Sequence, residues 1–265
     1  MPCRLPMDRI LIDLDKVNPK FARPNTFCAN TAFLPFALST CSMFLAVGAA
    51  PHVEVFRNSL FLVCFVICIL SVFLFIIPRI FKWDRKAEYF GVSVIYLGSV
   101  ALLGAIPWGS ILLYSKLPIV LRVVGFLLYL FILIGWAWRF VVVYRSISGN
   151  AINRQRIYVE SDALIYYRQK TDVRILEKEM RFRQFPNALF VIIFMFGAVL
   201  TIPNATYLKS IVGLPFTHLF LAIAAIPTDM MAKGLVTRGF IVYYVYPRMI
   251  FKESGKRVFV DLVSR

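Results

Sequence analysis

Three ionisable residues lie inside long apolar stretches of the sequence: Arg122, His218 and Asp229. Such a residue is a candidate functional group in a membrane, because its burial there is costly unless it is paired or hydrated. Asp229 has Lys233 four residues further on, the spacing of a helix salt bridge. Arg122 is close enough to the end of its stretch for its head group to reach water. His218 has no such neighbour, so we expect it to contact another helix or a hydrated pocket.

Two prolines, Pro215 and Pro227, share the last apolar stretch with His218 and Asp229. A proline inside a helix removes one backbone hydrogen bond, and transporters use breaks of this kind at binding sites. Kinked helices also occur in purely structural bundles. The last apolar stretch is therefore where we expect function or movement to concentrate.

The sequence predicts neither an enzyme nor a bound cofactor or metal. It has two histidines, His52 and His218, and no span contains the convergent acid, base or ligand groups that catalysis or metal binding requires. Nucleotide-binding, zinc-protease and serine-hydrolase motifs are also absent. Cys64 and Cys68 share a helix face without a histidine or carboxylate nearby, so we interpret them as packing residues.

The composition identifies the bilayer as the solvent of this chain. It is 60% hydrophobic, with a mean hydropathy of +0.74 and 25 Phe among its 265 residues. A transmembrane helix needs about 20 apolar residues. Six stretches of that length predict six transmembrane helices: Thr31–Ala50, Ser59–Pro78, Tyr89–Trp108, Ile119–Trp138, Asn187–Tyr207 and Ser210–Ala232.

The basic residues predict the orientation of these helices. With the N-terminus inside and strict alternation, all but four of the 30 Lys and Arg fall on the cytoplasmic side or at its border; the exceptions are Arg57, Lys116, Arg122 and Lys209. This asymmetry is typical of inner or plasma membrane proteins and predicts that both termini are cytoplasmic. It also accounts for the net charge of +16 without a nucleic-acid partner.

Two cytoplasmic stretches have strand-like sequences. In the loop after the fourth helix, 156–159 and 164–168 read as a hairpin, and 173–176 reads as a third strand. In the tail, 240–246 reads as a strand, and 249–251 with 258–260 reads as a second hairpin. Neither hairpin is stable alone, so we expect the two stretches to pair into one β module, or else to lie separately on the membrane surface.

The predicted fold is thus an all-α polytopic membrane bundle with a small cytoplasmic β module built from the loop and the tail. The segments expected are a cytoplasmic N-terminal segment at 1–30, helices one to four at 31–138, the loop at 139–186, helices five and six at 187–232, and a β-rich tail at 233–265. The module carries a candidate interaction surface consisting of Arg154, Arg156, Arg168, Lys252, Lys256 and Arg257.

Three function classes fit these features. We expect a non-catalytic membrane protein that acts through the lipid bilayer and a protein partner or a second copy of itself, such as an immunity protein against a membrane-acting toxin or an accessory subunit. The alternative is an oligomeric channel or permeability effector. A small-solute transporter is less favoured, because the sequence has no internal repeat and no evident pair of polar, broken helices.

Overall fold

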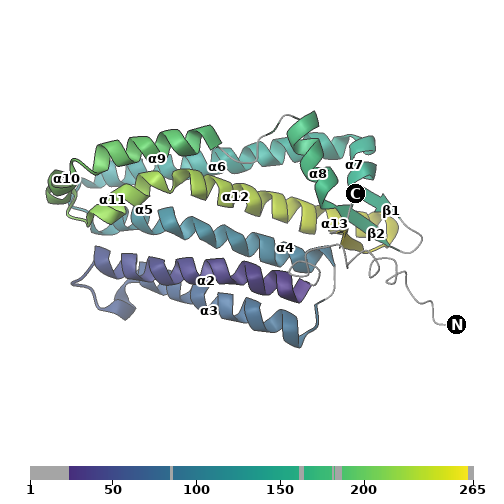
Figure 1. The fold of residues 1–265 in the computed structure, drawn as a ribbon, viewed down its shortest axis with the longest axis horizontal. Coiled ribbons are helices and arrows are strands. Elements are labelled where there is room, and N and C mark those ends of the chain that lie inside the picture. The colour runs from purple at the N-terminus through teal and green to yellow at the C-terminus, as the bar shows by residue number, and fades with distance from the viewer. Residues whose placement is uncertain (1–23, 84–85, 161–163, 181, 183–186, 262–265) are drawn as a thin grey trace.

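A computed structural model describes residues 24–83, 86–160, 164–180, 182 and 187–261. Most of the predicted N-terminal segment, 1–30, lies outside the described residues. The helices run along one long axis, with a small sheet at one end and the short helix α10 (Ala205–Val212) at the opposite end (Figure 1). The predicted helical bundle with a small β module is therefore present in outline.

Four helical stretches are long and apolar enough to cross a membrane: Phe27–Ala49, Ser59–Ile80, Ala87–Tyr114 and Ile119–Ser148. The first, second and fourth belong to α2 (Pro24–Ala49), α3 (Ser59–Ile80) and α6 (Ile119–Gly149). The third consists of α4 (Ala87–Tyr96), the 3₁₀ turn η3 (Leu97–Ala101) and α5 (Leu102–Tyr114). All four overlap the first four predicted helices.

The remaining helices differ from the two predicted after the loop. The helix α9 (Asn187–Thr201) has 15 residues. The predicted sixth helix, 210–232, is divided, because α10 ends at Gly213 in a left-handed conformation (φ +76°) and the chain turns by 98° into α11 (Phe216–Ala224). With α10 and α11 taken as one bent span, the described residues contain up to five candidate spans.

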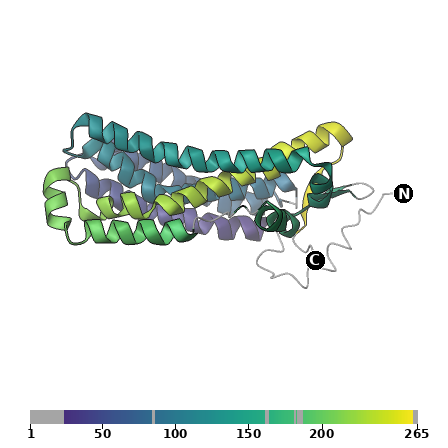
Figure 2. The same cartoon turned by 90° about the horizontal axis from the view of Figure 1, so that it is seen from above.

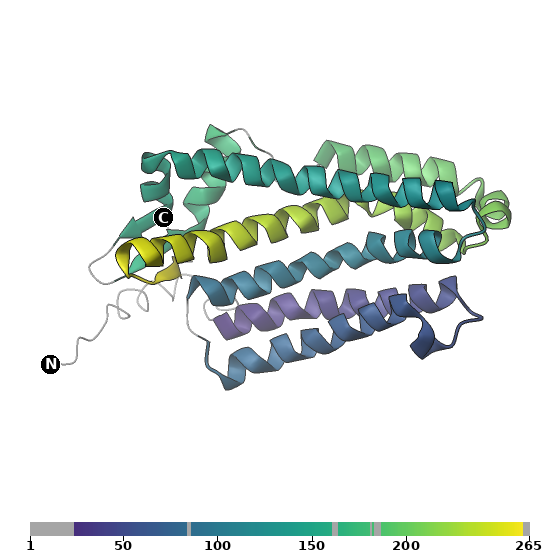
Figure 3. The same cartoon turned by 180° about the vertical axis from the view of Figure 1, so that it is seen from behind.

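The last helical series lies in the middle of the bundle. After α11 it continues as α12 (Ile226–Phe240), the π-helical turn η5 (Ile241–Val245) and α13 (Tyr246–Ser254). It packs against α4 and η3 on one side and α6 on the other, and Figures 2 and 3 show it between these helices. By contrast, only 17% of the apolar stretch of α3 and of α6 is buried, so most of their large apolar side chains face outward.

Local capping explains where one of the outer helices begins. Asn58, which is 1% exposed, accepts hydrogen bonds through Oδ1 from the backbone amides of Leu60 and Phe61 at 3.0 and 3.3 Å. Its Nδ2 donates to the Ala46 carbonyl of α2 at 2.8 Å. Asn58 therefore starts α3 and joins it to α2 at the end of the molecule opposite the sheet.

The sheet joins the loop to the tail. It has the order β1 (Tyr158–Glu160), β2 (Ile165–Arg168) and β3 (Val258–Asp261). The first two strands are antiparallel, whereas β2 and β3 are parallel, with Tyr166 opposite Phe259. The loop hairpin was predicted correctly apart from residues 156–157, which are helical. The 258–260 strand and the pairing of the loop with the tail were also predicted correctly.

Three other predicted strands are wrong. Residues 173–176 form the end of α8 (Gln169–Arg174) and the start of a π-helical turn, η4 (Ile175–Glu179). Residues 240–246 and 249–251 are helical and belong to the end of α12, to η5 and to α13, so the tail is mainly helical. The helix continues because it packs between other helices and the sheet, and this packing outweighs the strand preference of its β-branched and aromatic residues.

Candidate functional sites

A buried polar cluster lies where the sheet meets the helices. Asp172 of α8 is 0% exposed, and its Oδ2 accepts hydrogen bonds from Tyr167 Oη at 2.7 Å and from Tyr144 Oη at 2.9 Å. Arg238 Nη2 donates to the same oxygen at 2.9 Å, which makes a buried ion pair. We call Asp172, Arg238, Tyr144 and Tyr167 the buried joint.

Four elements supply this joint: α6, β2, α8 and α12. The side chains of β2 alternate between two faces. Tyr167, at the third position of the strand, lies on the buried face and so reaches Asp172, whereas Tyr166 and Arg168 lie on the other face. Arg238 is 9% exposed and donates also to Tyr144 Oη through Nε, at 3.1 Å. The joint therefore ties the loop to the fourth span and to the last helix.

Aromatic residues surround the joint and keep water away from it. The rings of Tyr158 and Tyr243 lie 5.5 and 5.3 Å from that of Tyr167. Tyr158 Oη donates to the Val242 carbonyl, in the π-helical turn η5, at 2.9 Å. Burial, with the charge of Asp172, raises the pKa of the Tyr158 and Tyr167 hydroxyls well above the usual value for tyrosine, so both remain neutral donors. The buried joint therefore suits a structural role, in which it holds the loop, α6 and α12 in fixed positions relative to one another.

Sequence reasoning missed the joint. Asp172 lies between Lys170 and Arg174 in a polar segment that looks solvated. Its partners Tyr144 and Arg238 are 28 and 66 residues away in the chain, so no short sequence pattern indicates these contacts. The one available signal was the tyrosine content of the predicted strands.

His218 contacts a neighbouring helix, as expected. It is 1% exposed, and its Nε2 lies 2.8 Å from the Leu45 carbonyl of α2. A carbonyl can only accept, so Nε2 carries the proton. Nδ1 has no hydrogen-bond partner in the structure.

Asp229 is fully buried in the centre of the bundle, not near its end. Its Oδ2 accepts from Tyr129 Oη of α6 at 2.8 Å, so its hydrogen-bond partner comes from another helix, and the salt bridge expected with Lys233 is not its anchor. Oδ1 has no hydrogen-bond partner. Gly104 makes room for the carboxylate, since a Cβ there would lie 1.9 Å from Oδ2.

We expect Gly104→Ala to lower the free energy of unfolding by about 1–3 kcal/mol, because the added methyl group must displace the Asp229 carboxylate. Gly135→Ala is the matched control: no atom lies within 4 Å of its added Cβ, so the same change in a helix should be neutral or slightly stabilising. Thermal unfolding in detergent measures both. Equal melting temperatures for the two variants would contradict the close approach at Gly104.

The remaining intramembrane candidates, two prolines and an arginine, lie at helix starts or bond to a neighbouring helix. Pro215 immediately precedes α11, and Pro227 lies in the first turn of α12, where a helix needs no backbone donor. Arg122 is half-buried and donates through Nη1 to the Leu112 carbonyl at 3.1 Å. His218 contacts α2, Asp229 contacts α6 and Arg122 contacts α5. These candidates therefore do not form a single site.

The candidate interaction surface gathers around the sheet and α13. Arg154 pairs with Glu253 at 3.9 Å, and Lys256 pairs with Glu160 at 2.6 Å, so two of its cations link the loop to the tail. Arg168 and Lys252 are exposed at the end of β2 and in α13. Arg156 lies in the short helix α7 (Ala151–Ile157), not in the predicted strand.

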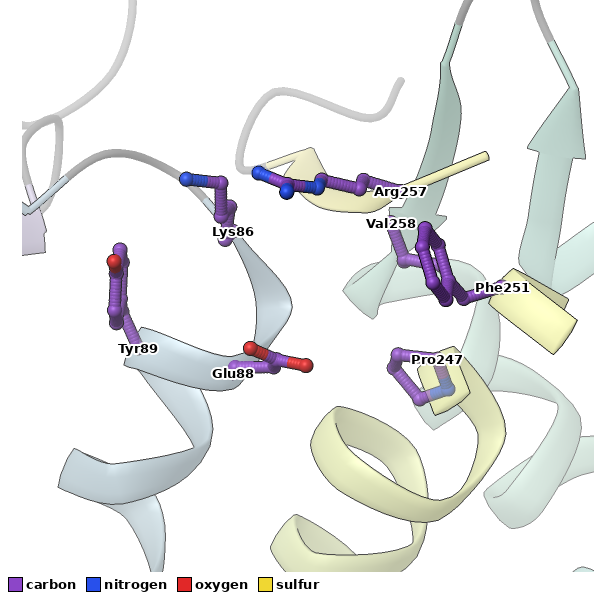
Figure 4. Close-up of a pocket in the computed structure, with 7 residues that line it drawn as sticks. All are labelled: Lys86, Glu88, Tyr89, Pro247, Phe251, Arg257 and Val258. Carbon is purple, nitrogen blue, oxygen red and sulfur yellow. The ribbon is translucent and has the colours of Figure 1, made fainter. Parts of the chain in front are cut away.

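Arg257 lies apart from the others, in a pocket between the start of α4, α13 and the start of β3 (Figure 4). The pocket encloses about 270 Å³. Among the described residues, its charged lining side chains are Lys86, Glu88 and Arg257, and its other lining residues are Tyr89, Pro247, Phe251 and Val258. Sequence reasoning missed this pocket, because Lys86 and Arg257 meet only through the fold.

Among the described residues, no group of three His, Cys, Asp or Glu side chains could hold a metal ion. No family model, no curated protein and no solved structure matches the chain.

Proposed function

We propose that the protein is a six-span membrane protein that acts by binding a protein partner through its cytoplasmic β module, without catalysis. A toxin antagonist and an accessory subunit of a membrane assembly are two members of this class. The single observation that carries the proposal is the parallel pairing of β2 with β3, which makes one body from the loop and the tail.

The arrangement of the helices supports the membrane part of the proposal. Four stretches can cross the bilayer; we assign the fifth crossing to α9 and the sixth to α11 with α12. At 1.5 Å per residue the 15 residues of α9 extend about 22 Å, so this crossing is short for a bilayer core of about 30 Å. Because cytoplasmic ends are rich in Lys and Arg, we assign the end with the sheet to the cytoplasm.

The buried joint supports the binding part. Interfaces that bind partners benefit from a preorganised surface, because less conformational entropy is lost on binding. Asp172 and Arg238 fix the sheet against α6 and α12, so the surface that carries Arg168 and Lys252 is held in one position. Tight coupling to the last helix also lets a bound partner act on the bundle.

One observation favours a second function, an oligomeric channel or permeability effector. Asp229 is a buried intramembrane carboxylate with one oxygen lacking a hydrogen-bond partner, beside the break between α11 and α12. Broken helices with such groups line ion pathways in transport proteins. The third span is also interrupted nearby, by η3.

Ion flux into liposomes separates the two functions. We expect vesicles with the purified protein to show the same flux as empty vesicles, because the intramembrane candidates contact three different helices and form no continuous polar path. Robust flux that Asp229→Asn abolishes would move the protein to the channel class.

Photo-crosslinking of the protein in its native membrane tests partner binding. A photo-crosslinking residue at Arg168 should trap one discrete partner, and the same residue at Phe131, which is 73% exposed on α6, should trap none. If the Arg168 position crosslinks only to lipid, the partner-binding proposal is wrong.

A further inference from the structure

The pocket at Lys86 and Arg257 lies beside the first residues of the third span. The span begins at Ala87, directly after Lys86, and α13 continues the last helix on the far side of the pocket. Trp83 and Tyr89 stack at this level with ring centroids 4.7 Å apart, and Phe251, which lines the pocket, is 49% exposed. Stacked aromatic rings of this kind belong at the headgroup level of a bilayer. A lipid headgroup therefore has direct access.

The charges of the pocket match a group that carries both signs. Lys86 and Arg257 lie along one rim in Figure 4, and the Glu88 carboxylate lies on the wall between α4 and Pro247. Two cations suit a phosphodiester, and the N-terminus of α4, which starts beside Lys86, favours negative charge as well. The Glu88 carboxylate suits an ammonium group. Purely anionic lipids meet Glu88 as a like charge.

The aromatic residues discriminate between ammonium groups. A quaternary ammonium is usually held by open aromatic faces. Tyr89 is covered, because Trp83 stacks on its ring and the Lys86 ammonium lies over it, 5.5 Å from its centroid. Among the described lining residues only the ring of Phe251 is then left, and one ring does not make an aromatic cage. A primary ammonium has three N–H donors and can bond to Glu88 directly.

We propose that this pocket binds the phosphoethanolamine headgroup of a membrane phospholipid, with the phosphodiester at Lys86 and Arg257 and the ammonium group at Glu88. Arg257 is the one residue that this site shares with the candidate interaction surface, and the proposal rests only on the membrane location of the chain. The site gives the molecule a lipid-dependent contact between the third span, the last helix and the tail strand.

Native mass spectrometry of the full-length protein in detergent tests the proposal, with phosphatidylethanolamine, phosphatidylglycerol and phosphatidylcholine titrated separately. We expect phosphatidylethanolamine to be retained at about tenfold lower concentration than either of the others, the effect of one charge-assisted hydrogen bond. Arg257→Gln should weaken the retention of all three lipids, because each carries a phosphodiester. Lys252→Gln removes an equal charge from α13 outside the pocket and should leave the retention of all three lipids unchanged.

Glu88→Gln gives the second readout, since both Glu88 and Arg257 are exposed and their replacement leaves the core intact. It should abolish the preference for phosphatidylethanolamine over phosphatidylglycerol and retain phosphate binding. Equal retention of the three lipids by the unmodified protein would overturn the proposal. Equal losses from Arg257→Gln and Lys252→Gln would also overturn it. So would tighter binding of soluble phosphoethanolamine than of phosphatidylethanolamine, which would identify a soluble ligand.

Discussion

Asp172→Asn is expected to lower the free energy of unfolding by about 3–5 kcal/mol, because it removes the carboxylate that pairs with the buried Arg238 guanidinium. The change keeps the size of the side chain, so it tests charge and hydrogen bonding and not packing. Tyr144 and Tyr167 also lose the anionic acceptor that holds their hydroxyl groups. Thermal unfolding of the purified protein in detergent measures the effect.

Two further variants show whether the pair itself is responsible. Glu160→Gln removes the ion pair between Glu160, whose side chain is 64% exposed, and Lys256. Exposed ion pairs contribute little to stability, so the melting temperature of this variant should stay close to that of the unmodified protein. The double variant Asp172→Asn with Arg238→Met removes both charges and should be more stable than Asp172→Asn alone. Additive losses in the double variant would show that the two residues act separately.

The sequence was most informative where a pattern is repeated over many residues. The first four spans were recognisable because each is a run of apolar side chains about as long as the bilayer is thick. The 164–168 strand was recognisable from its Ile and Tyr residues beside a predicted turn. Such signals are local and need no knowledge of the partner element.

The prediction for the tail was wrong because its residues prefer strands, whereas the elements that pack around it favour a helix. Residues 241–245 are all β-branched or aromatic, yet they form a π-helical turn that follows α12. The turn precedes Pro247, whose missing N–H falls in the first turn of α13, so proline does not end the helical series as expected. Tyr158 from β1 bonds to the Val242 carbonyl, a contact across 84 residues that sequence spacing does not reveal.

The candidate sites show the same division. Arg122, His218 and Asp229 were identified because a charge in an apolar run is conspicuous, although their partners were not. Asp172 and the Lys86–Arg257 pocket were missed, since their members look like ordinary polar surface until the loop and tail meet.

Removing β3 should release the loop from the bundle. Truncation after Lys256 deletes Val258 and Val260, which are 4% and 2% exposed, and with them the parallel partner of β2. Two buried valines contribute about 3 kcal/mol by burial, so we expect the bond after Arg168 to become about a hundredfold more sensitive to trypsin. The reason is that cleavage follows the population of the opened loop.

Trypsin cleavage in vesicles of known orientation therefore tests most directly the central claim, that loop and tail form one cytoplasmic module. With trypsin on the cytoplasmic side, we expect slow cleavage at Arg168 in the full chain and in a control truncated after Asp261, which retains β3, and fast cleavage after truncation at Lys256. With trypsin on the opposite side, we expect no cleavage at Arg168 in any of them. Equal cleavage rates with and without β3, or cleavage at Arg168 from the opposite side, would contradict the account.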